Sequence, residues 1–505
     1  MHAGYHEPEE EYPVKWNNLI SSLKVQARGG KADPIIADIV YDSRKVTPGC
    51  VYVSIPGMVV HGDQFIAQAM EQGAVAVISQ NPQLACTVPW IQVENSRIVL
   101  GELARKLWNM KLYNTMLVGV TGTNGKTTVA YLYRKLLEEL NRNKDVWMFS
   151  TVGYSMGKAG QDAHRTTPES SDIFRLIGKA DEKPAALVME VSSHALHLNR
   201  VAGFSYDIGV WTNLTQDHLD FHHNMTEYYE AKKKLFTTYL KSKGKAIINI
   251  DDEYGRMLSR ELEGVKQITF GTSHDATVRI VNWKCDWSGS EIDIITKGEI
   301  IHFRSCLVGF FNVYNMAALA AGAIAMSVSP RRVQKALDKL TPVPGRMQQV
   351  PVDADFQVVV DYAHTPDALE NVLSTTRELT KGRVICVFGC GGDRDKTKRP
   401  LMAEAVVAGA DEAVITSDNP RIENPMDIID DILDGVPLDF PHWVIPDRKE
   451  GIACAIELAR PGDCIVVAGK GHENYQEIYG VRHPFDDKVV IGEIFEGRQE
   501  TRAHA

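Results

Sequence analysis

The stretch VGVTGTNGKTTVA, residues 118–130, leads from an apolar, strand-like run through a glycine-containing turn into a helix-like run. Glycines let backbone N–H groups face a phosphate, and the N-terminus of a helix favours anions. Lys126 adds a point charge, and the hydroxyl of Thr127 can reach a magnesium ion. The stretch predicts a phosphate-binding loop, although Val120 replaces the first glycine of the strict G-x-x-x-x-G-K-[ST] pattern. A glycine turn that binds nothing is the alternative interpretation.

The strand and helix patterns around this loop divide the chain into three blocks. Residues 1–108 carry short β-rich runs and one helix-like run, which is typical of a small α/β domain. Residues 109–343 alternate strand-like and helix-like runs, which favours a parallel, wound sheet. Residues 344–505 add four buried-strand candidates after a break rich in Pro and Gly. We expect an α/β fold of three domains, with a central P-loop-type parallel-sheet ATPase domain and a Rossmann-like C-terminal domain.

Bulk composition excludes several classes of protein. The 505 residues carry a net charge of -10, which argues against a general nucleic-acid binder, because phosphate binding needs clustered Lys and Arg. The acidic start lacks the order of a signal peptide, and the longest apolar run, Met316–Val328, is too short to span a bilayer. We expect a cytoplasmic protein with no membrane insertion and with no nucleic acid as a partner. Its eight scattered cysteines, without a CxxC pair, are expected to be reduced core residues.

The loop TGTNGKTT, residues 121–128, resembles the ATP loop of the superfamily that contains Mur ligases and folylpolyglutamate synthases. Further motifs extend the resemblance to the Mur ligase family over nearly the whole chain: EVSSHAL, NLTQDHLDFH, YYEAKKKLF, FNVYNMAALAA, PGRM, VDYAHTPDAL, GCGGDRDKTKRP, SDNPR and AGKGHE. So many motifs in one order are more specific than any one of them. The resemblance implies an ATP-dependent ligase that uses Mg²⁺. It would extend the peptide of UDP-MurNAc-L-Ala-D-Glu through an acyl phosphate, in peptidoglycan precursor synthesis.

The same resemblance implies roles for residues around ATP. The nucleotide-binding residues would be Gly122, Thr123, Asn124, Gly125, Lys126, Thr127, Thr128, Asn312, Arg346, Asp361 and His364. The catalytic residues would be Lys126, Lys232 and His218, and the metal ligands Thr127, Glu190 and Lys232. Lys232 stands where Mur ligases carry a carbamylated lysine. Carbamylation turns a cation into a carboxylate-like anion that can hold a second magnesium ion.

Simpler interpretations stand beside some of these roles. Glu190 alone, at a strand end, would most simply be a solvated or capping residue. The histidines of DHLDFHH, read alone, suggest a zinc site, but an HExxH pattern is missing and we rank zinc hydrolysis well below ligation. We expect His222 and His223 to be surface residues, and Lys233 and Lys234 to belong to a solvated helix face.

The nucleotide-sugar end of the substrate has weaker signals. By resemblance, Ser43 and Val59 would line the uridine pocket. Thr166, Thr167, Ser192 and Arg200 would contact the phosphates and carboxylates of the sugar peptide. Turn and capping roles explain the Thr and Ser residues equally well.

The motif SDNPR, residues 417–421, bears on which amino acid is added. A guanidinium recognises a carboxylate with two parallel hydrogen bonds, and meso-diaminopimelate differs from lysine by a second carboxylate at its distal end. Arg421 meets that need. The resemblance implies a binding site for this amino acid that consists of Arg394, Asp418, Asn419, Pro420, Arg421, Gly469 and Glu473.

Other functions remain as alternatives at this point. Folate polyglutamylation and the addition of another amino acid lie within the superfamily, and SDNPR argues against both. A P-loop NTPase that couples hydrolysis to motion or signalling would turn over ATP without any amino acid. A nucleotide sensor would bind ATP without turnover. The partners that we expect are UDP-MurNAc-L-Ala-D-Glu, meso-diaminopimelate and ATP, with the chain acting as a monomer.

Overall fold

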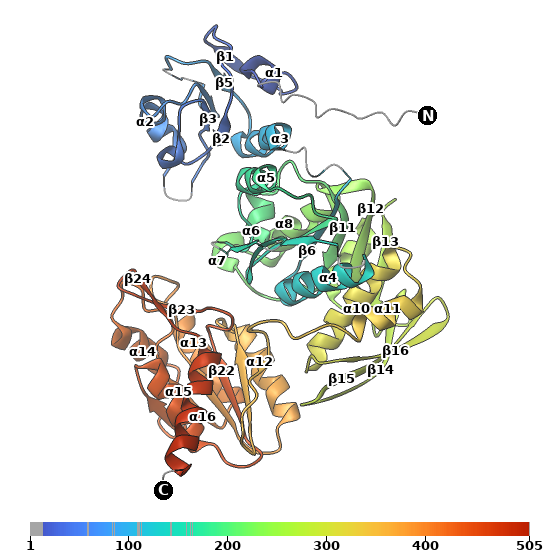
Figure 1. Cartoon of the computed structure of the whole chain (residues 1–505), viewed down its shortest axis with the longest axis vertical. Helices are drawn as coiled ribbons and strands as arrows, with labels where there is room; N and C mark the ends of the chain where they lie inside the picture. The colour runs from blue at the N-terminus through green and yellow to red at the C-terminus, as the bar shows by residue number, and fades with distance from the viewer. Residues whose placement is uncertain are drawn as a thin grey trace. The chain divides into compact units, whose positions relative to one another are not determined.

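The computed structural model describes residues 14–57, 60–82, 84, 86–108, 112, 114–141, 144–157, 159–161, 163 and 165–503. The chain divides into two compact units, residues 1–267 and 268–505, and Figure 1 labels many of their helices and strands. Among the helices in the described ranges, none is both long enough and apolar enough to cross a membrane.

The first unit begins with a small five-stranded sheet in the order β1-β5-β4-β3-β2. β1 is antiparallel to β5, and the other neighbours are parallel. Its strands are β1 (Ala27–Gly29), β2 (Asp38–Val40), β3 (Cys50–Val53), β4 (Ala76–Ser79) and β5 (Trp90–Gln92). Its helices are α1 (Trp16–Ile20), η1 (Ser43–Lys45), η2 (Gly62–Phe65), α2 (Ile66–Glu71) and α3 (Ser96–Trp108). The β-rich runs of the sequence therefore form the strands expected for this region.

The rest of the first unit contains strands in the order β12-β11-β6-β10-β7-β8-β9. The neighbours from β12 to β7 are parallel, while β8 and β9 are added antiparallel. The strands are β6 (Met116–Thr121), β7 (Val146–Ser150), β8 (Gly153–Met156), β9 (Ala159–Gln161), β10 (Ala186–Glu190), β11 (Tyr206–Trp211) and β12 (Leu240–Asn249). The helices are α4 (Lys126–Leu140), α5 (Ser170–Lys179), α6 (Ser193–His197), α7 (Leu219–His222), α8 (Met225–Thr237) and α9 (Glu253–Glu261). The predicted parallel, wound sheet is confirmed.

The second unit opens with four strands in sequence order, followed by two helices. The strands are β13 (Lys266–Gly271), β14 (Val278–Asp286), β15 (Gly289–Thr296) and β16 (Glu299–Ser305). The helices are α10 (Phe310–Ala325) and α11 (Pro330–Leu337). Most of α10 is buried, so the longest apolar run of the sequence belongs largely to a core helix.

The C-terminal part of the second unit has a six-stranded sheet in the order β17-β18-β22-β19-β20-β21. Its strands are β17 (Gln348–Gln349), β18 (Gln357–Asp361), β19 (Val384–Phe388), β20 (Glu412–Ile415), β21 (His442–Val444) and β22 (Cys464–Ala468), and all but β17 are parallel. Its helices are α12 (Pro366–Leu379), α13 (Lys398–Gly409), α14 (Pro425–Leu433), α15 (Arg448–Leu458) and α16 (Asp487–Ala503). A separate hairpin joins β23 (Tyr475–Ile478) to β24 (Val481–Pro484).

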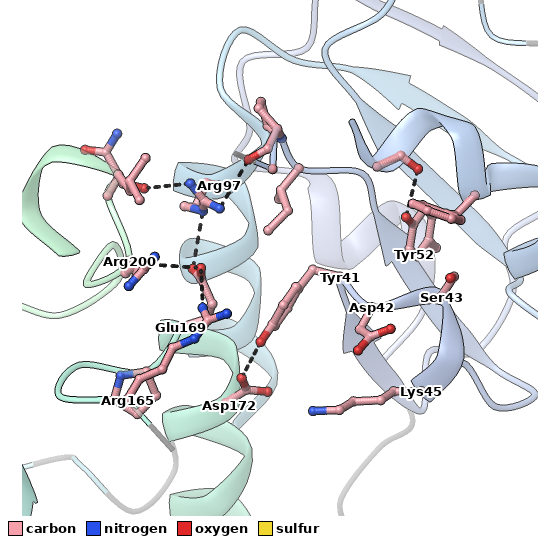
Figure 2. Close-up of a pocket in the computed structure, with 18 of the residues that line it drawn as sticks. Tyr41, Asp42, Ser43, Lys45, Tyr52, Arg97, Arg165, Glu169, Asp172 and Arg200 are labelled. Atoms are coloured by element: carbon pink, nitrogen blue, oxygen red, sulfur yellow. Dashed lines mark hydrogen bonds and ion pairs between the residues drawn. The ribbon is translucent and has the colours of Figure 1, made fainter. Parts of the chain in front are cut away.

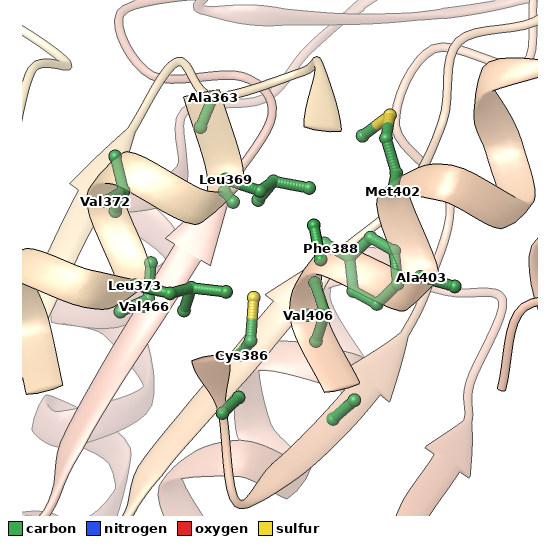
Figure 3. Close-up of a cluster of buried hydrophobic side chains, with 14 of the residues drawn as sticks. Ala363, Leu369, Val372, Leu373, Cys386, Phe388, Met402, Ala403, Val406 and Val466 are labelled. Atoms are coloured by element: carbon green, nitrogen blue, oxygen red, sulfur yellow. The ribbon is translucent and has the colours of Figure 1, made fainter. Parts of the chain in front are cut away.

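Alternation along β19 places apolar side chains on both faces of this sheet. Cys386 and Phe388 pack with side chains of α12 and α13, as Figure 3 shows. Ile385 and Val387 pack instead in a second cluster with residues of α15 and α16. Helices therefore cover both faces, which confirms the Rossmann-like C-terminal fold.

The cysteines agree only in part with the expectation of core residues. Cys50, Cys386, Cys390 and Cys464 are buried, but Cys306 is exposed. Cys306 directly follows the edge strand β16 and continues its alternation of buried and exposed residues, so its side chain is exposed although Leu307 and Val308 after it are buried.

A buried ion pair between α15 and α16 gives a test of this packing. Arg448 donates two hydrogen bonds of 2.8 Å to Asp487, and both side chains are fully buried. Arg448→Met leaves the carboxylate without its counter-charge, so we expect the free energy of unfolding to fall by about 3–5 kcal/mol. Lys449→Met breaks the exposed neighbouring pair with Glu493 and should cost at most about 1 kcal/mol. Urea denaturation measures both, and equal losses would contradict this explanation.

Candidate functional site

The glycine loop occupies the turn between β6 and α4, as the sequence predicts. Gly125 precedes the first residue of α4 and has a φ of 80°, in the left-handed region that glycine favours. Gly122 has a φ of 149°, and a Cβ atom there would lie 1.8 Å from Thr212 Oγ1. Both glycines are therefore required by the backbone and by the packing.

Residues that follow β11 hold this loop in shape. The N–H groups of Thr123 and Asn124 donate to the main-chain and side-chain oxygens of Asn213, at 2.8 and 2.9 Å. Thr212 Oγ1 donates to the carbonyl of Asn124 at 2.6 Å. Lys126 Nζ folds back to donate to the carbonyl of Thr123 at 2.7 Å. The loop is thus fixed by the protein itself.

Glu190 lies at the end of β10, next to the loop, because β10 pairs in register with β6. Its carboxylate is buried and accepts hydrogen bonds of 3.0 Å from Thr127 Oγ1. Thr151 donates to the same carboxylate from its N–H and from its hydroxyl, at 3.0 and 3.1 Å. A carboxylate surrounded by hydroxyl oxygens is a donor set suited to a hard cation.

Three residues expected to contact the sugar peptide lie beside Glu190. Thr166 Oγ1 is 3.0 Å from Thr151 Oγ1. Thr167 Oγ1 donates to the carbonyl of Glu190 at 2.8 Å, and Ser192 caps α6 by accepting from Ala195 N. The capping interpretation therefore accounts for the contact of Ser192 with Ala195, whereas the contact of Thr167 joins it to the end of β10 and is neither a turn nor a cap.

Lys232 of α8 is buried beneath the loop. Its Nζ donates to the carbonyl of Gly122 at 2.6 Å and lies 4.5 Å from the centre of the Tyr228 ring. Burial, and then the positive charge of Lys126, hold the pKa of Lys232 well below its ordinary value, although Asp217 and Glu190 act in the opposite direction. The site therefore favours the neutral form of the amine more than water does.

His218 directly precedes α7 with a left-handed backbone, and its Nε2 lies 3.3 Å from Asp217 Oδ2. The expectation that His222 is a surface residue is wrong, whereas His223 is exposed as predicted. The short helix α7 turns His222 inward, where its ring packs against Tyr228 with centroids 5.1 Å apart. Burial lowers the pKa of His222 to about 4. Within the described ranges, no group of three or more His, Cys, Asp or Glu is placed to hold a metal ion.

A pocket of about 1350 Å³ lies in the first unit, and Figure 2 shows part of its lining. It contains the predicted residues Ser43 and Arg200, whereas the predicted Val59 lies outside the described residues. Lining residues that the sequence interpretation missed include Tyr41, Arg97, Arg165, Glu169 and Asp172. Arg97 is the second residue of α3, and Glu169 directly precedes α5. Neither belongs to a motif whose spacing would have indicated a binding role.

The other predicted nucleotide residues belong to the second unit. Asp361, at the end of β18, is buried and accepts from the N–H groups of Met347 and Ala363 at 2.6 and 2.8 Å. Burial raises its pKa, and Arg346 opposes that rise. The Arg346 guanidinium lies 4.8 Å from the centre of the Tyr362 ring.

Two further nucleotide residues of the second unit make local hydrogen bonds. The amide of Asn312 donates to the carbonyl of Val308 at 2.8 Å. His364 Nδ1 lies 2.7 Å from the carbonyl oxygen of Tyr362.

The SDNPR turn and the AGKGHE motif meet in the C-terminal part of the second unit. Asn419 Nδ2 donates to Glu473 Oε2 at 2.9 Å, and a Cβ on Gly469 would lie 3.5 Å from the Asp418 carboxyl. Arg421 donates to the carbonyl of Gly392, which follows β19. Most residues expected to hold the amino acid therefore form one cluster.

Arg394 and Pro420 complete the predicted set. Arg394 is exposed, and its Cγ and Arg421 Nη1 lie 3.8 and 3.0 Å from where a Cβ of Gly391 would stand. Pro420 is buried within the SDNPR turn, and its carbonyl lies 2.0 Å from where a Cβ of Gly392 would stand. Because Gly391 and Gly392 have no side chains, the SDNPR turn can pack closely against the chain after β19.

Lys470 was missed by the sequence interpretation, although it lies within AGKGHE. It is fully buried, and its Nζ contacts Asn419 Oδ1 and Glu473 Oε2, both at 3.1 Å. Asp418 Oδ1 lies 3.7 Å away. A cation therefore sits among the acidic groups of the cluster.

The hairpin β23–β24 is bonded to the same turn. Arg421 N donates to the carbonyl of Glu477 at 2.9 Å, and Gln476 Nε2 donates to the carbonyl of Asp418 at 2.8 Å. The hairpin therefore supports the cluster from its outer side.

Three family models match the chain in succession. They are "Mur ligase family, catalytic domain" over residues 36–108, "Mur ligase middle domain" over 120–324 and "Mur ligase, glutamate ligase domain" over 345–471. The chain belongs to the Mur ligase family. Among Mur ligases, a curated relative from Clostridium acetobutylicum is named UDP-N-acetylmuramoyl-L-alanyl-D-glutamate–2,6-diaminopimelate ligase 1. It is 41% identical over 487 residues, which cover 95% of this chain and 99% of the relative.

Solved structures are also similar to the chain. One described as a UDP-N-acetylmuramoyl-L-alanyl-D-glutamate–2,6-diaminopimelate ligase is 32% identical, with a TM-score of 0.68 over 97% of this chain and 100% of that one. A Mycobacterium tuberculosis folylpolyglutamate synthase with ADP is 16% identical, with a TM-score of 0.61 over 74% of this chain and 91% of that one. At that identity, the second likeness shows the fold alone.

Gly122→Ala tests the phosphate loop. The new Cβ would overlap Thr212 Oγ1, so the loop must shift, and we expect ATP affinity to fall by at least about tenfold. Gly264→Ala is the matched control, because Gly264 also has a positive φ but has no atom within 4 Å of the new Cβ. Isothermal titration with ATP measures both variants. Equal affinities would show that the close packing at Gly122 does not matter for the nucleotide.

Proposed function

We propose that this Mur ligase joins meso-diaminopimelate to the D-glutamate of UDP-MurNAc-L-Ala-D-Glu, with conversion of ATP to ADP and phosphate. The observation that carries the proposal is the 41% identity to a ligase named for these substrates, over nearly the full length of both chains. The phosphate loop, the pocket that contains Ser43 and Arg200 and the cluster around Arg421 support it. The divisions at 108/109 and 343/344, a cytoplasmic location and a monomeric state stay predictions.

The first step would activate the glutamate carboxylate. A carboxylate oxygen attacks the γ-phosphorus of ATP, the bond to the β-phosphate oxygen breaks, and ADP leaves. Gly122–Thr128 would hold the phosphates, with Lys126 and His218 placed to stabilise the charge of the transferred group. Asn312, Arg346, Asp361 and His364 would contact the rest of the nucleotide. The product is an acyl phosphate.

The second step would form the amide. The neutral amine of diaminopimelate attacks the acyl carbon, the tetrahedral intermediate expels phosphate, and the amine loses a proton. Exclusion of water protects the acyl phosphate, which hydrolysis would otherwise destroy. Among the nucleotide-sugar residues, Ser43 and Arg200 line the large pocket, whereas Thr166, Thr167 and Ser192 surround Glu190. Val59 remains a proposed contact from the resemblance.

Magnesium fits the donor set beside the loop. Thr127 and Glu190 offer hard oxygen atoms 3.0 Å apart in a buried setting, and a carbamate on Lys232 would add another oxygen donor. Bound there, Mg²⁺ would neutralise charge on the ATP phosphates.

The cluster around Arg421 would hold the distal end of diaminopimelate. Arg421 and Arg394 supply cations for its carboxylate, whereas Asp418 and Glu473 supply anions for its ammonium group. Asn419, Pro420 and Gly469 would complete the site. Lysine lacks the distal carboxylate and would leave the guanidinium without that partner.

Phosphate release tests the reaction directly. We expect release only when ATP, UDP-MurNAc-L-Ala-D-Glu and meso-diaminopimelate are all present, with a tripeptide product by mass spectrometry. Release from ATP alone would favour a P-loop NTPase, and ATP binding without release would favour a sensor. Transfer of glutamate to a folate would favour the other branch of the superfamily.

The same assay tests Arg421. For Arg421→Ala, we expect the KM for meso-diaminopimelate to rise by about 100-fold and the preference over lysine to disappear. Arg482→Ala is the control, because Arg482 lies on the hairpin that is bonded to the SDNPR turn but stacks on Tyr475. An unchanged preference in the Arg421 variant would sink the proposed amino-acid site.

We also propose that Lys232 is carbamylated. The depressed pKa favours the neutral amine, whose lone pair would attack the carbon of CO₂; a C–N bond forms, one proton leaves to solvent and a carbamate anion results. With ¹³C-bicarbonate, we expect a carbamate NMR signal from the wild type and from Lys233→Arg, but not from Lys232→Arg. Lys233 is a matched control, because ion pairs with Glu261 and Glu230 raise its pKa. A signal that persists in Lys232→Arg would contradict the assignment.

A further inference from the structure

One buried carboxylate in the large pocket forms ion pairs with three arginines from separate parts of the chain. Glu169, which directly precedes α5, is 2% exposed. Arg97 Nε on α3 and Arg200 Nε after α6 each lie 3.4 Å from it, and Arg165 Nη1 lies 4.0 Å away. Figure 2 shows these side chains converging on Glu169 at the pocket wall.

The remaining carboxylates of the pocket are already paired. Asp42 binds Arg44 at 2.8 Å, and Asp172 binds Arg175 at 3.0 Å and accepts from Tyr41. Among the described lining residues, Glu169 therefore balances Arg97, Arg165 and Arg200 by itself. The group carries two more positive charges than negative ones.

The contacts within this group are ion pairs that leave hydrogen-bonding capacity unused. In the described part of the chain, Arg97 Nε, Arg200 Nε and Glu169 Oε2 are buried and have no hydrogen-bond partner. Buried donors of this kind are costly unless a ligand or water satisfies them. An anionic ligand with several oxygen atoms would supply both the missing acceptors and the missing charge.

Without Glu169, the three positive charges would repel one another where the pocket lining excludes much of the water. The Arg97 guanidinium also donates long bonds, to the carbonyls of Pro56 and Leu198 at 3.4 and 3.5 Å. Arg200 is fixed at its main chain, where its carbonyl accepts from Ser170 N at 2.8 Å. The direction of the guanidinium groups therefore depends on Glu169.

We propose that Glu169 is a positioning residue, which aims Arg97, Arg165 and Arg200 at acidic oxygens of the nucleotide-sugar substrate. The inference rests on the proposed function. The acidic oxygens belong either to the diphosphate or to the peptide carboxylates, and both have the chemistry that a guanidinium recognises.

The test uses the full-length Glu169→Gln variant, which removes the charge and keeps the shape. We expect the KM for UDP-MurNAc-L-Ala-D-Glu to rise by about tenfold or more, with kcat and the KM values for ATP and diaminopimelate unchanged within about twofold. Glu138→Gln is the matched control, because Glu138 also pairs with two cations, Arg134 and Lys135, but lies outside the pocket. Glu169→Asp keeps the charge, provides a second folded variant and should raise the KM less.

Isothermal titration separates the two sources of acidic oxygens. Weaker binding of both UDP-N-acetylglucosamine and UDP-MurNAc-L-Ala-D-Glu by Glu169→Gln would show that the arginines bind the diphosphate. Weaker binding of the dipeptide substrate alone would show that they bind its carboxylates, and either result supports the positioning role. An unchanged or lower KM in the folded variant would overturn it. A wild-type protein that neither binds nor uses UDP-MurNAc-L-Ala-D-Glu would refute the proposed function instead.

Discussion

The carboxyl ends of three neighbouring parallel strands, β10, β6 and β11, set the geometry on which the rest of the first unit depends. Because β10 and β6 run in register, Glu190 ends next to the glycine loop. Asn213, just after β11, binds the loop from the other side. Thr212 fills the space that a side chain at position 122 would need. A loop held in this way keeps its backbone dipoles oriented before a nucleotide arrives, so little reorganisation is needed on binding.

Buried ionisable groups differ in what surrounds them, and that difference separates structural charges from a reactive amine. Lys470 contacts the side chains of Asn419, Glu473 and Asp418. Lys232 donates instead to a neutral carbonyl, and Lys126 disfavours its charged form. The same residue type therefore joins a polar network in one place and is a candidate nucleophile toward CO₂ in the other.

Local patterns in the sequence predicted the strands and the loop, whereas the family resemblance supplied most members of the cluster around Arg421. Apolar runs marked β6, β10, β19 and β22, because strands buried on both faces must be apolar throughout. Contacts between distant segments left no such trace. Arg97 and Glu169 meet only because α3 packs against α5, and His222 is buried only because a left-handed residue turns α7 inward. Burial of a polar side chain is a property of the assembled fold, so spacing could not reveal it.

In the proposed amino-acid site, selectivity would follow from the mixture of charges around Arg421. Arg421 donates to one carbonyl and its Nε lies 3.9 Å from Glu477, which is beyond hydrogen-bond distance, whereas a guanidinium carries five N–H donors. Asp418 Oδ1 is buried, and its contact with Lys470 at 3.7 Å is an ion pair without a hydrogen bond. A ligand end that has both an ammonium group and a carboxylate can satisfy both sides of the cluster. A ligand with only the ammonium group gains half of these bonds and still removes water from the guanidinium. An unmatched guanidinium donor would lower the affinity for a simple amine. This penalty, more than the gain from a matched donor, would make the site prefer a ligand with an amino-acid end.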